Sequence, residues 1–171
     1  MSKLSLRGPV ISAGLLLGAG LGAFVDGILL HQLLQWHNML SSVRPPTDLV
    51  SMKYNMLWDG AFHALAWLSV VLGVWRLWRA GAREDVSWST HTLVGSALLG
   101  WGLFNFVEGV IDHELLGLHH VHPGQHEVAW DLAFFAFGLL QIAAGGVTDR
   151  PMRSACDRPS GSSPDRPSRA T

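Results

Sequence analysis

The fold is decided by an almost uncharged stretch near the start of the chain. Residues 10–30 read VISAGLLLGAGLGAFVDGILL, in which Asp26 is the one charged side chain. A helix needs about 20 apolar residues to cross the roughly 30 Å hydrocarbon core of a membrane. Similar apolar runs occupy residues 60–75, 92–107 and 132–147, and each extends past an acidic residue into more apolar sequence. The sequence therefore predicts an all-α fold, a bundle of four transmembrane helices.

The composition agrees with a chain that is surrounded largely by lipid. Of the 171 residues, 49% are hydrophobic and 15% are charged, and the net charge is −1. The near-zero net charge provides no basic field for nucleic acid, so we expect membrane lipid and no nucleic acid as partners. The one cysteine, Cys156, excludes an internal disulfide and a cysteine-based zinc site. Nine histidines and eight tryptophans remain to be explained.

The basic residues predict the orientation of the chain in the membrane. All but two of the 12 lysines and arginines fall on one side of the four runs, and Arg44 and Lys53 are the two exceptions. Because cytoplasmic segments are rich in basic residues, we expect both termini in the cytoplasm of a bacterium and a multi-pass protein of its inner membrane. Loops 38–57 and 119–129 would face outward. Lys3 and Arg7 before the first run leave a signal peptide as the alternative for that run.

Two domains of different character are expected. Residues 1–147 form the four-helix transmembrane domain. Residues 148–171 repeat Asp-Arg-Pro among serine and glycine, which predicts a disordered cytoplasmic tail with no core to bury.

A tandem repeat carries the polar residues of the transmembrane domain. Residues 26–37 and 108–119 share one spacing: an acid followed by glycine, then three residues and a histidine, then five residues and a second histidine. In the following helices, Trp58-Asp59 aligns with Trp130-Asp131, and the position of His63 is occupied by a phenylalanine in the second copy. Repeat 1 covers about 8–79 and repeat 2 about 88–147. Two copies of the same orientation predict a pseudo-two-fold axis along the membrane normal, with functional groups at the repeat interface.

The repeat predicts a buried metal site. At 1.5 Å per residue, the four acids of the repeat lie at one depth near the outer boundary. Four carboxylates so close together cannot all ionise unless something offsets their mutual repulsion and the cost of burying their charge. Protonation, water or a bound cation could do so, and the neighbouring imidazoles favour the cation. The candidate ligands are Asp26, His31, His37, Asp59, His63, Glu108, Asp112, His113, His119 and Asp131. With no thiolate nearby, zinc or iron suits these ligands best, and copper or manganese is also possible.

Helical spacing supports some of these ligand pairs and not others. Asp59 and His63 are four residues apart and share a face, as do Glu108 and Asp112. Asp26 and His31 are five apart, about 140° around an ideal helix, and the same holds for the pair in the second repeat. Either the helices distort near Gly27 and Gly109, or these histidines orient the ligands from an outer shell.

Two further groups of polar residues complete the prediction. Residues 119–126 read HHVHPGQH and form a His-rich loop. This loop is either a site that captures metal for the deeper site or a solvated surface whose charge changes with pH. Asn55, Asn105 and Gln141 are expected to form hydrogen bonds between helices.

The combined motif resembles a bacterial family of predicted four-helix membrane proteins of unknown function. The resemblance rests on Asp26-Gly27 with His31, on Trp36-His37, and on Trp58-Asp59-Gly60 with His63, and it covers residues 8–147. It implies membrane location and transfers no catalytic residue. Members of the family occur near genes for copper handling and cytochrome oxidase assembly, which implies a metal-handling or respiratory-oxidase partner.

Several functions are compatible with the sequence. The first is a membrane protein that binds one or two transition-metal ions for metal handling or redox-enzyme maturation. The second is a zinc-dependent intramembrane hydrolase acting on a lipid-like substrate. A haem protein with His31 and His113 as axial ligands, and an ion- or proton-translocating homodimer, are further alternatives. A metal-free polar network is the competing structural explanation, and the sequence leaves open whether the protein is an enzyme.

Overall fold

The computed structural model describes residues 6–148, and within them the chain is helical. It contains α1 (Gly8–Asp26), α2 (Leu49–Gly81), α3 (Thr90–Glu108) and α4 (Glu127–Thr148). Two π-helices, η1 (Gly27–Leu33) and η2 (Gly109–Leu115), continue α1 and α3 without a break. Four segments are long and apolar enough to cross a membrane, which confirms the all-α prediction. Cys156 and the predicted tail beyond Thr148 lie outside the described residues.

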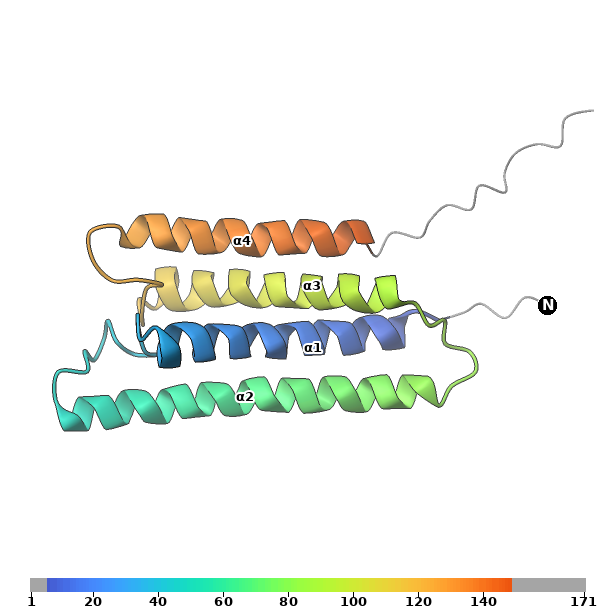
Figure 1. Cartoon of the computed structure of the whole chain (residues 1–171), viewed down its shortest axis with the longest axis horizontal. Coiled ribbons are helices and arrows are strands. Elements are labelled where there is room, and N and C mark those ends of the chain that lie inside the picture. The colour runs from blue at the N-terminus through green and yellow to red at the C-terminus, as the bar shows by residue number, and fades with distance from the viewer. Residues whose placement is uncertain (1–5, 149–171) are drawn as a thin grey trace, which may run out of the picture.

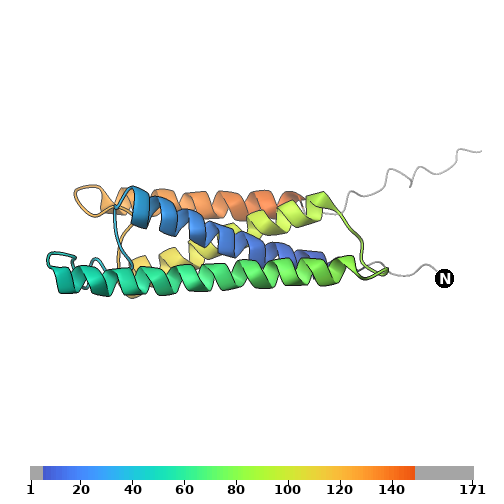
Figure 2. The ribbon, with the colours of Figure 1, turned by 60° about the horizontal axis from the view of Figure 1, so that its bottom comes forward.

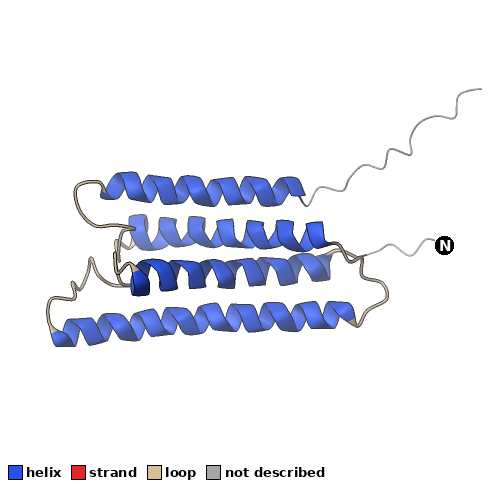
Figure 3. Ribbon diagram, viewed as in Figure 1, coloured by secondary structure: helices blue, strands red, loops and turns tan. Residues whose placement is uncertain are grey.

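The helices are arranged as two pairs joined through their inner members. α1 packs against α3 at the centre, α2 packs against α1, and α4 packs against α3. Figures 1 and 3 show the resulting order α4, α3, α1, α2, and Figure 2 shows that the two central helices cross. Within residues 6–148, α2 and α4 do not contact each other. The central contact therefore relates the two halves of the tandem repeat.

Glycine allows the two central helices to approach closely. A Cβ atom on Gly18 would collide with the backbone of Ala97, and one on Gly100 would collide with the backbone of Leu15. Gly18 and Gly100 occupy the same position in the two repeats, as do Leu15 and Ala97. Small residues permit such backbone contacts between helices in lipid. The glycine-rich runs of the sequence are therefore the interface between the repeats.

Polar side chains join the helices within each pair. Asn105 donates to Gln141 across the α3–α4 contact at 2.9 Å, as predicted. In the α1–α2 pair, the Ser69 hydroxyl donates to the carbonyl oxygen of Leu16 at 2.9 Å. The prediction was wrong for Asn55, which binds the adjacent loop: its side chain accepts from Leu40 N–H and donates to the Arg44 carbonyl oxygen.

The outward loops are shorter than predicted because the helices begin earlier. α2 starts at Leu49, not after residue 57, and α4 starts at Glu127. The carboxylate of Asp48 caps α2 by accepting from the N–H groups of Val50 and Ser51 at 2.8 and 3.0 Å. The Ser51 hydroxyl also donates to this carboxylate and lowers the pKa of Asp48. Runs of hydrophobicity could not reveal the polar first turns of these helices.

Candidate metal centre

Of the two alternatives that the spacing left open, the helix distortion near Gly27 and Gly109 is present in both repeats. From these glycines onward the backbone is π-helical, with hydrogen bonds between residues five apart instead of four. Side chains five apart are thereby brought toward one face. Nε2 of His31 lies 3.4 Å from Oδ2 of Asp26, and Nε2 of His113 lies 3.5 Å from Oε1 of Glu108. The five-residue spacing thus brings each acid to an imidazole, which an ideal α-helix would not do.

Each glycine also makes room for an aromatic ring from the neighbouring helix. A Cβ atom on Gly27 would lie 2.7 Å from Nε2 of His63, and one on Gly109 would lie 3.0 Å from Cε1 of Phe135. His63 Nδ1 donates to the Asp59 carbonyl oxygen of its own helix at 2.7 Å. His63 therefore occupies the packing position that Phe135 occupies in repeat 2.

A left-handed residue after each π-helix turns the chain back over the end of the bundle. Gln35 has a φ of 52° and Gly117 a φ of 57°, at the same position of the two repeats. Glycine adopts this conformation freely, whereas for another residue it costs roughly 1–2 kcal/mol. The turns return His37 and His119 toward the π-helices.

In repeat 1, the carboxylate of Asp59 orients His31. Its Oδ1 lies 3.1 Å from His31 Nδ1. The same carboxylate accepts from the Met39 N–H at 2.8 Å and from the Asn38 side chain at 2.7 Å. A histidine that donates Nδ1–H to a carboxylate keeps its Nε2 lone pair for a metal.

In repeat 2, the carboxylate of Asp131 has the corresponding surroundings. Its Oδ1 lies 3.2 Å from His113 Nδ1 and accepts from the Val121 N–H at 3.0 Å. Its Oδ2 accepts from His120 Nδ1 at 2.7 Å. His120 thus stands where repeat 1 has Asn38. Asp59 and Asp131 each contact a histidine at Nδ1, and neither belongs to the groups of converging ligand atoms described below.

The second histidine of each repeat binds the other repeat. His37 Nδ1 donates to the carbonyl oxygen of Val121 at 2.8 Å, and His119 Nδ1 donates to that of Met39 at 3.2 Å. The two rings stack with centroids 4.5 Å apart and planes at 10°. Burial, with smaller contributions from His119 and His31, lowers the pKa of His37 to about 3. These reciprocal contacts lie between the repeats, where the pseudo-two-fold axis was predicted.

The four imidazoles and the carboxylate of Glu108 form two groups that share His119. His119 Nε2 lies 3.1 Å from Oε1 of Glu108. Ligand atoms of His31, His37 and His119 lie within 4.8 Å of one another, as do those of Glu108, His113 and His119. Four buried atoms in the cluster have no hydrogen-bond partner within residues 6–148: Asp26 Oδ2, His31 Nε2, His37 Nε2 and Glu108 Oε2. His113 Nδ1 also forms no hydrogen bond in this range, but it faces the carboxylate of Asp131 at 3.2 Å. The interior of this cluster is therefore short of hydrogen-bond partners.

The structure separates the ten predicted ligands into three sets. His31, His37, Glu108, His113 and His119 form the two converging groups, and Asp26 adjoins them through His31. Asp59 and Asp131 support histidines from outside. His63 and Asp112 belong to neither group. The i, i+4 relationship between Glu108 and Asp112 does not apply, since the π-helix begins between them.

Two outer residues hold the carboxylates, Asn38 and His120. Sequence reasoning assigned no role to Asn38 and considered His120 only as part of the His-rich loop, for metal capture or as a solvated surface. Both lie directly after the second histidine of their repeat, and this shared position was the available signal. The rest of the His-rich loop is divided: His122 packs against Trp36 and Trp130, with ring centroids 4.9 and 6.0 Å apart, and His126 is exposed.

Comparison with known proteins identifies a family. The model of a family described as "Predicted membrane protein (DUF2243)" matches residues 13–151, so the chain belongs to this family of membrane proteins, whose function is unknown. No curated protein and no solved structure matches the chain.

Proposed function

We propose that this membrane protein binds one or two transition-metal ions in the buried cluster between α1 and α3. The ligands are the Nε2 atoms of four imidazoles and two carboxylates: His31, His37, His113, His119, Asp26 and Glu108. The observation that carries the proposal is His37 Nε2. Because His37 Nδ1 donates to a carbonyl oxygen, Nε2 of the neutral ring carries a lone pair, and this atom is buried with no hydrogen-bond partner in the described part of the chain. An unsatisfied buried acceptor is costly, and a metal ion would remove that cost.

The surroundings of His119 support the same proposal. Its Nδ1 faces the carbonyl oxygen of Met39 and its Nε2 faces the carboxylate of Glu108, so both nitrogens face acceptors. A neutral imidazole has one N–H and can satisfy only one of them. A cation between Nε2 and the carboxylate resolves the conflict. In a metal-free network, a protonated imidazolium would do so instead, and the experiment below separates these two states.

The donor atoms indicate the class of metal. Imidazole nitrogen and carboxylate oxygen, without thiolate, suit zinc or iron, and also copper or manganese. His119 belongs to both ligand groups, but its Nε2 lone pair can bind only one ion, so a second ion would have to be held by the remaining residues of the cluster. The Nδ1 hydrogen bonds to Asp59 and to backbone carbonyl oxygens fix the rings in the orientation that a metal requires.

Ring packing disfavours the haem alternative. Axial ligation by His31 and His113 would require a porphyrin between them. The ring of His119 packs edge-on against both of them, with centroids 5.7 Å from His31 and 4.9 Å from His113, and occupies space that a porphyrin would need.

The proposal includes the orientation of the four helices across the membrane. Arg76, Arg79 and Arg83 lie at the end of the bundle opposite the cluster. By the positive-inside rule, that end is cytoplasmic and the metal centre lies near the extracytoplasmic face of a bacterial inner membrane. This location suits metal handling or the maturation of a redox enzyme.

Elemental analysis of the full-length protein purified from membranes tests the proposal. We expect one to two zinc or iron ions per chain, retained through gel filtration. The double variant His37→Ala/His119→Ala should lose them. The matched control His91→Ala/His126→Ala removes two exposed histidines outside the cluster and should keep them. Wild-type protein that contains no transition metal, and takes up none when zinc or iron is added, would show that the cluster is a protonated polar network.

A further inference from the structure

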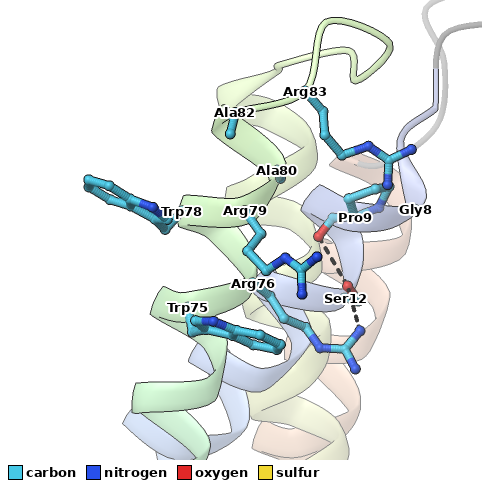
Figure 4. A pocket seen from close by; sticks show the side chains of 10 residues that line it. All are labelled: Gly8, Pro9, Ser12, Trp75, Arg76, Trp78, Arg79, Ala80, Ala82 and Arg83. Carbon is cyan, nitrogen blue, oxygen red and sulfur yellow. Dashed lines mark hydrogen bonds between the residues drawn. The ribbon is translucent and has the colours of Figure 1, made fainter.

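The end of the bundle opposite the metal centre contains an open groove of about 720 Å³. It lies between the first turns of α1 and the last turns of α2 (Figure 4). Arg76 and Arg79, three residues apart on one face of α2, line it together with Arg83 of the loop that follows α2. Figure 4 shows the side chains of Arg76 and Arg79 reaching from α2, and that of Arg83 from the following loop, toward the start of α1.

The positive charge of this groove is incompletely neutralised by the protein. Arg76 donates to the hydroxyl of Ser12 at 3.4 Å, and the guanidinium of Arg79 lies 5.1 Å above the ring of Trp75. Neither forms an ion pair within the described part of the chain. Arg83 forms a bidentate ion pair with Asp85, with N–O distances of 3.0 and 2.8 Å. Two guanidinium groups in the groove therefore have donors to spare.

The depth of the groove places it at the boundary of the hydrocarbon. Arg76 follows Asp59 along α2 by about 25 Å at 1.5 Å per residue, close to the roughly 30 Å thickness of the membrane core. Exposed tryptophans beside the arginines, Trp75 and Trp78, are typical of a helix surface at the level of lipid headgroups. A ligand in this groove would lie where phospholipid phosphates lie.

We infer that this groove binds the phosphodiester headgroup of an anionic phospholipid. Guanidinium groups present paired N–H donors that match phosphate oxygens, and basic pockets between transmembrane helices select anionic headgroups. α1 begins at Gly8 in the same groove, and the positive end of its dipole also favours an anion. The indole faces supply an apolar wall for the glycerol and upper acyl chains. Free phosphate shares the phosphate chemistry but not the need for that wall.

Native mass spectrometry of the full-length protein in micelles with equal phosphatidylcholine and phosphatidylglycerol tests this inference. We expect phosphatidylglycerol to be retained in preference to phosphatidylcholine. The variant Arg76→Gln/Arg79→Gln should lower its retention roughly tenfold or more, since each basic residue near the surface contributes about fivefold. The control Arg44→Gln/Lys53→Gln removes the same charge at the opposite end and should retain the lipid as wild type does.

Two outcomes would overturn the inference. The first is equal retention of phosphatidylglycerol by both double variants. The second is displacement of the lipid by excess inorganic phosphate, which would identify a site for the free anion. Gel filtration and circular dichroism establish that each variant is folded. If Arg76→Gln/Arg79→Gln is not recovered, Arg79→Gln alone, an exposed side chain stacked on an indole, gives the same test with about a fivefold expected loss.

Discussion

The two repeats build the same geometry with different residues. A carboxylate behind the first histidine accepts a 2.7 Å hydrogen bond from Asn38 in repeat 1 and from His120 in repeat 2. The left-handed turn is made by Gln35 in one copy and Gly117 in the other. Both repeats therefore have a hydrogen-bond donor to the carboxylate and a left-handed turn at the same positions, but different residues provide them.

The acid at the start of each π-helix marks the main asymmetry. Glu108 is one methylene longer than Asp26, and its Oε1 lies 3.5 Å from His113 and 3.1 Å from His119. Asp26 pairs with His31 at 3.4 Å. His119 consequently belongs to both ligand groups, whereas His37 belongs to one. The half that carries glutamate should hold metal more tightly.

Single alanine substitutions of the two stacked histidines test this asymmetry most directly. Loss of a shared ligand should affect the whole centre, so His119→Ala should lower metal affinity by more than the roughly hundredfold upper limit for outer-shell changes. His37→Ala should retain part of the metal through the glutamate half. Stoichiometry by elemental analysis and competition with a chelator measure both. Equal loss in the two variants would contradict the asymmetry.

The glycines at the centre of the bundle should show symmetry instead. Gly18→Ala and Gly100→Ala each place a Cβ against backbone of the facing helix, which cannot move aside as a flexible side chain can. We expect each to destabilise the protein by about 1–3 kcal/mol, by similar amounts. Thermal unfolding in detergent measures this effect. Gly60→Ala is the control, because a Cβ there meets nothing within 4 Å; a loss as large at Gly60 would count against the packing explanation.

The outer-shell carboxylates should be equivalent. Asp59→Asn and Asp131→Asn keep the side-chain shape but weaken the hold on His31 and His113, so each should lower metal affinity about ten- to hundredfold. Metal titration of the apoprotein measures the change, with Asp85→Asn at the opposite end as the control. An unchanged affinity in either variant would remove that carboxylate from the centre.

Exchanging the outermost donors should have the smallest effect. Asn38→His makes repeat 1 resemble repeat 2, and His120→Asn does the reverse, and each retains a donor to the carboxylate. We expect less than about a tenfold change in metal affinity, below the usual range for the loss of an outer-shell contact. The alanine variants at the same positions should exceed this change. If the exchanges are as damaging as alanine, the two donors are not interchangeable.

The sequence alone determined the parts of this protein that depend on local pattern. Four apolar runs predicted four helices because a membrane core of fixed thickness requires that length. The repeated acid-glycine-histidine spacing predicted the layer of carboxylates. Because an ideal helix would have directed Asp26 and His31 apart, it also left two alternatives, a distortion at Gly27 and Gly109 or histidines outside the ligand set, and the structure has the distortion. The extra turns of α2 were missed, because its outer end is polar and is fixed by Asp48 and Asn55.

Only the tertiary structure decided which residues form the interior of the centre. Periodicity treats each helix separately, so it favoured the pair Asp59 and His63 and left His37 and His119 at the margin. In the structure, the left-handed turns bring His37 and His119 inward, and each ring donates to the backbone of the other repeat. Which nitrogen of an imidazole remains for a ligand depends on what the other nitrogen meets. For His37 and His119 those partners lie 84 and 80 residues away in the chain.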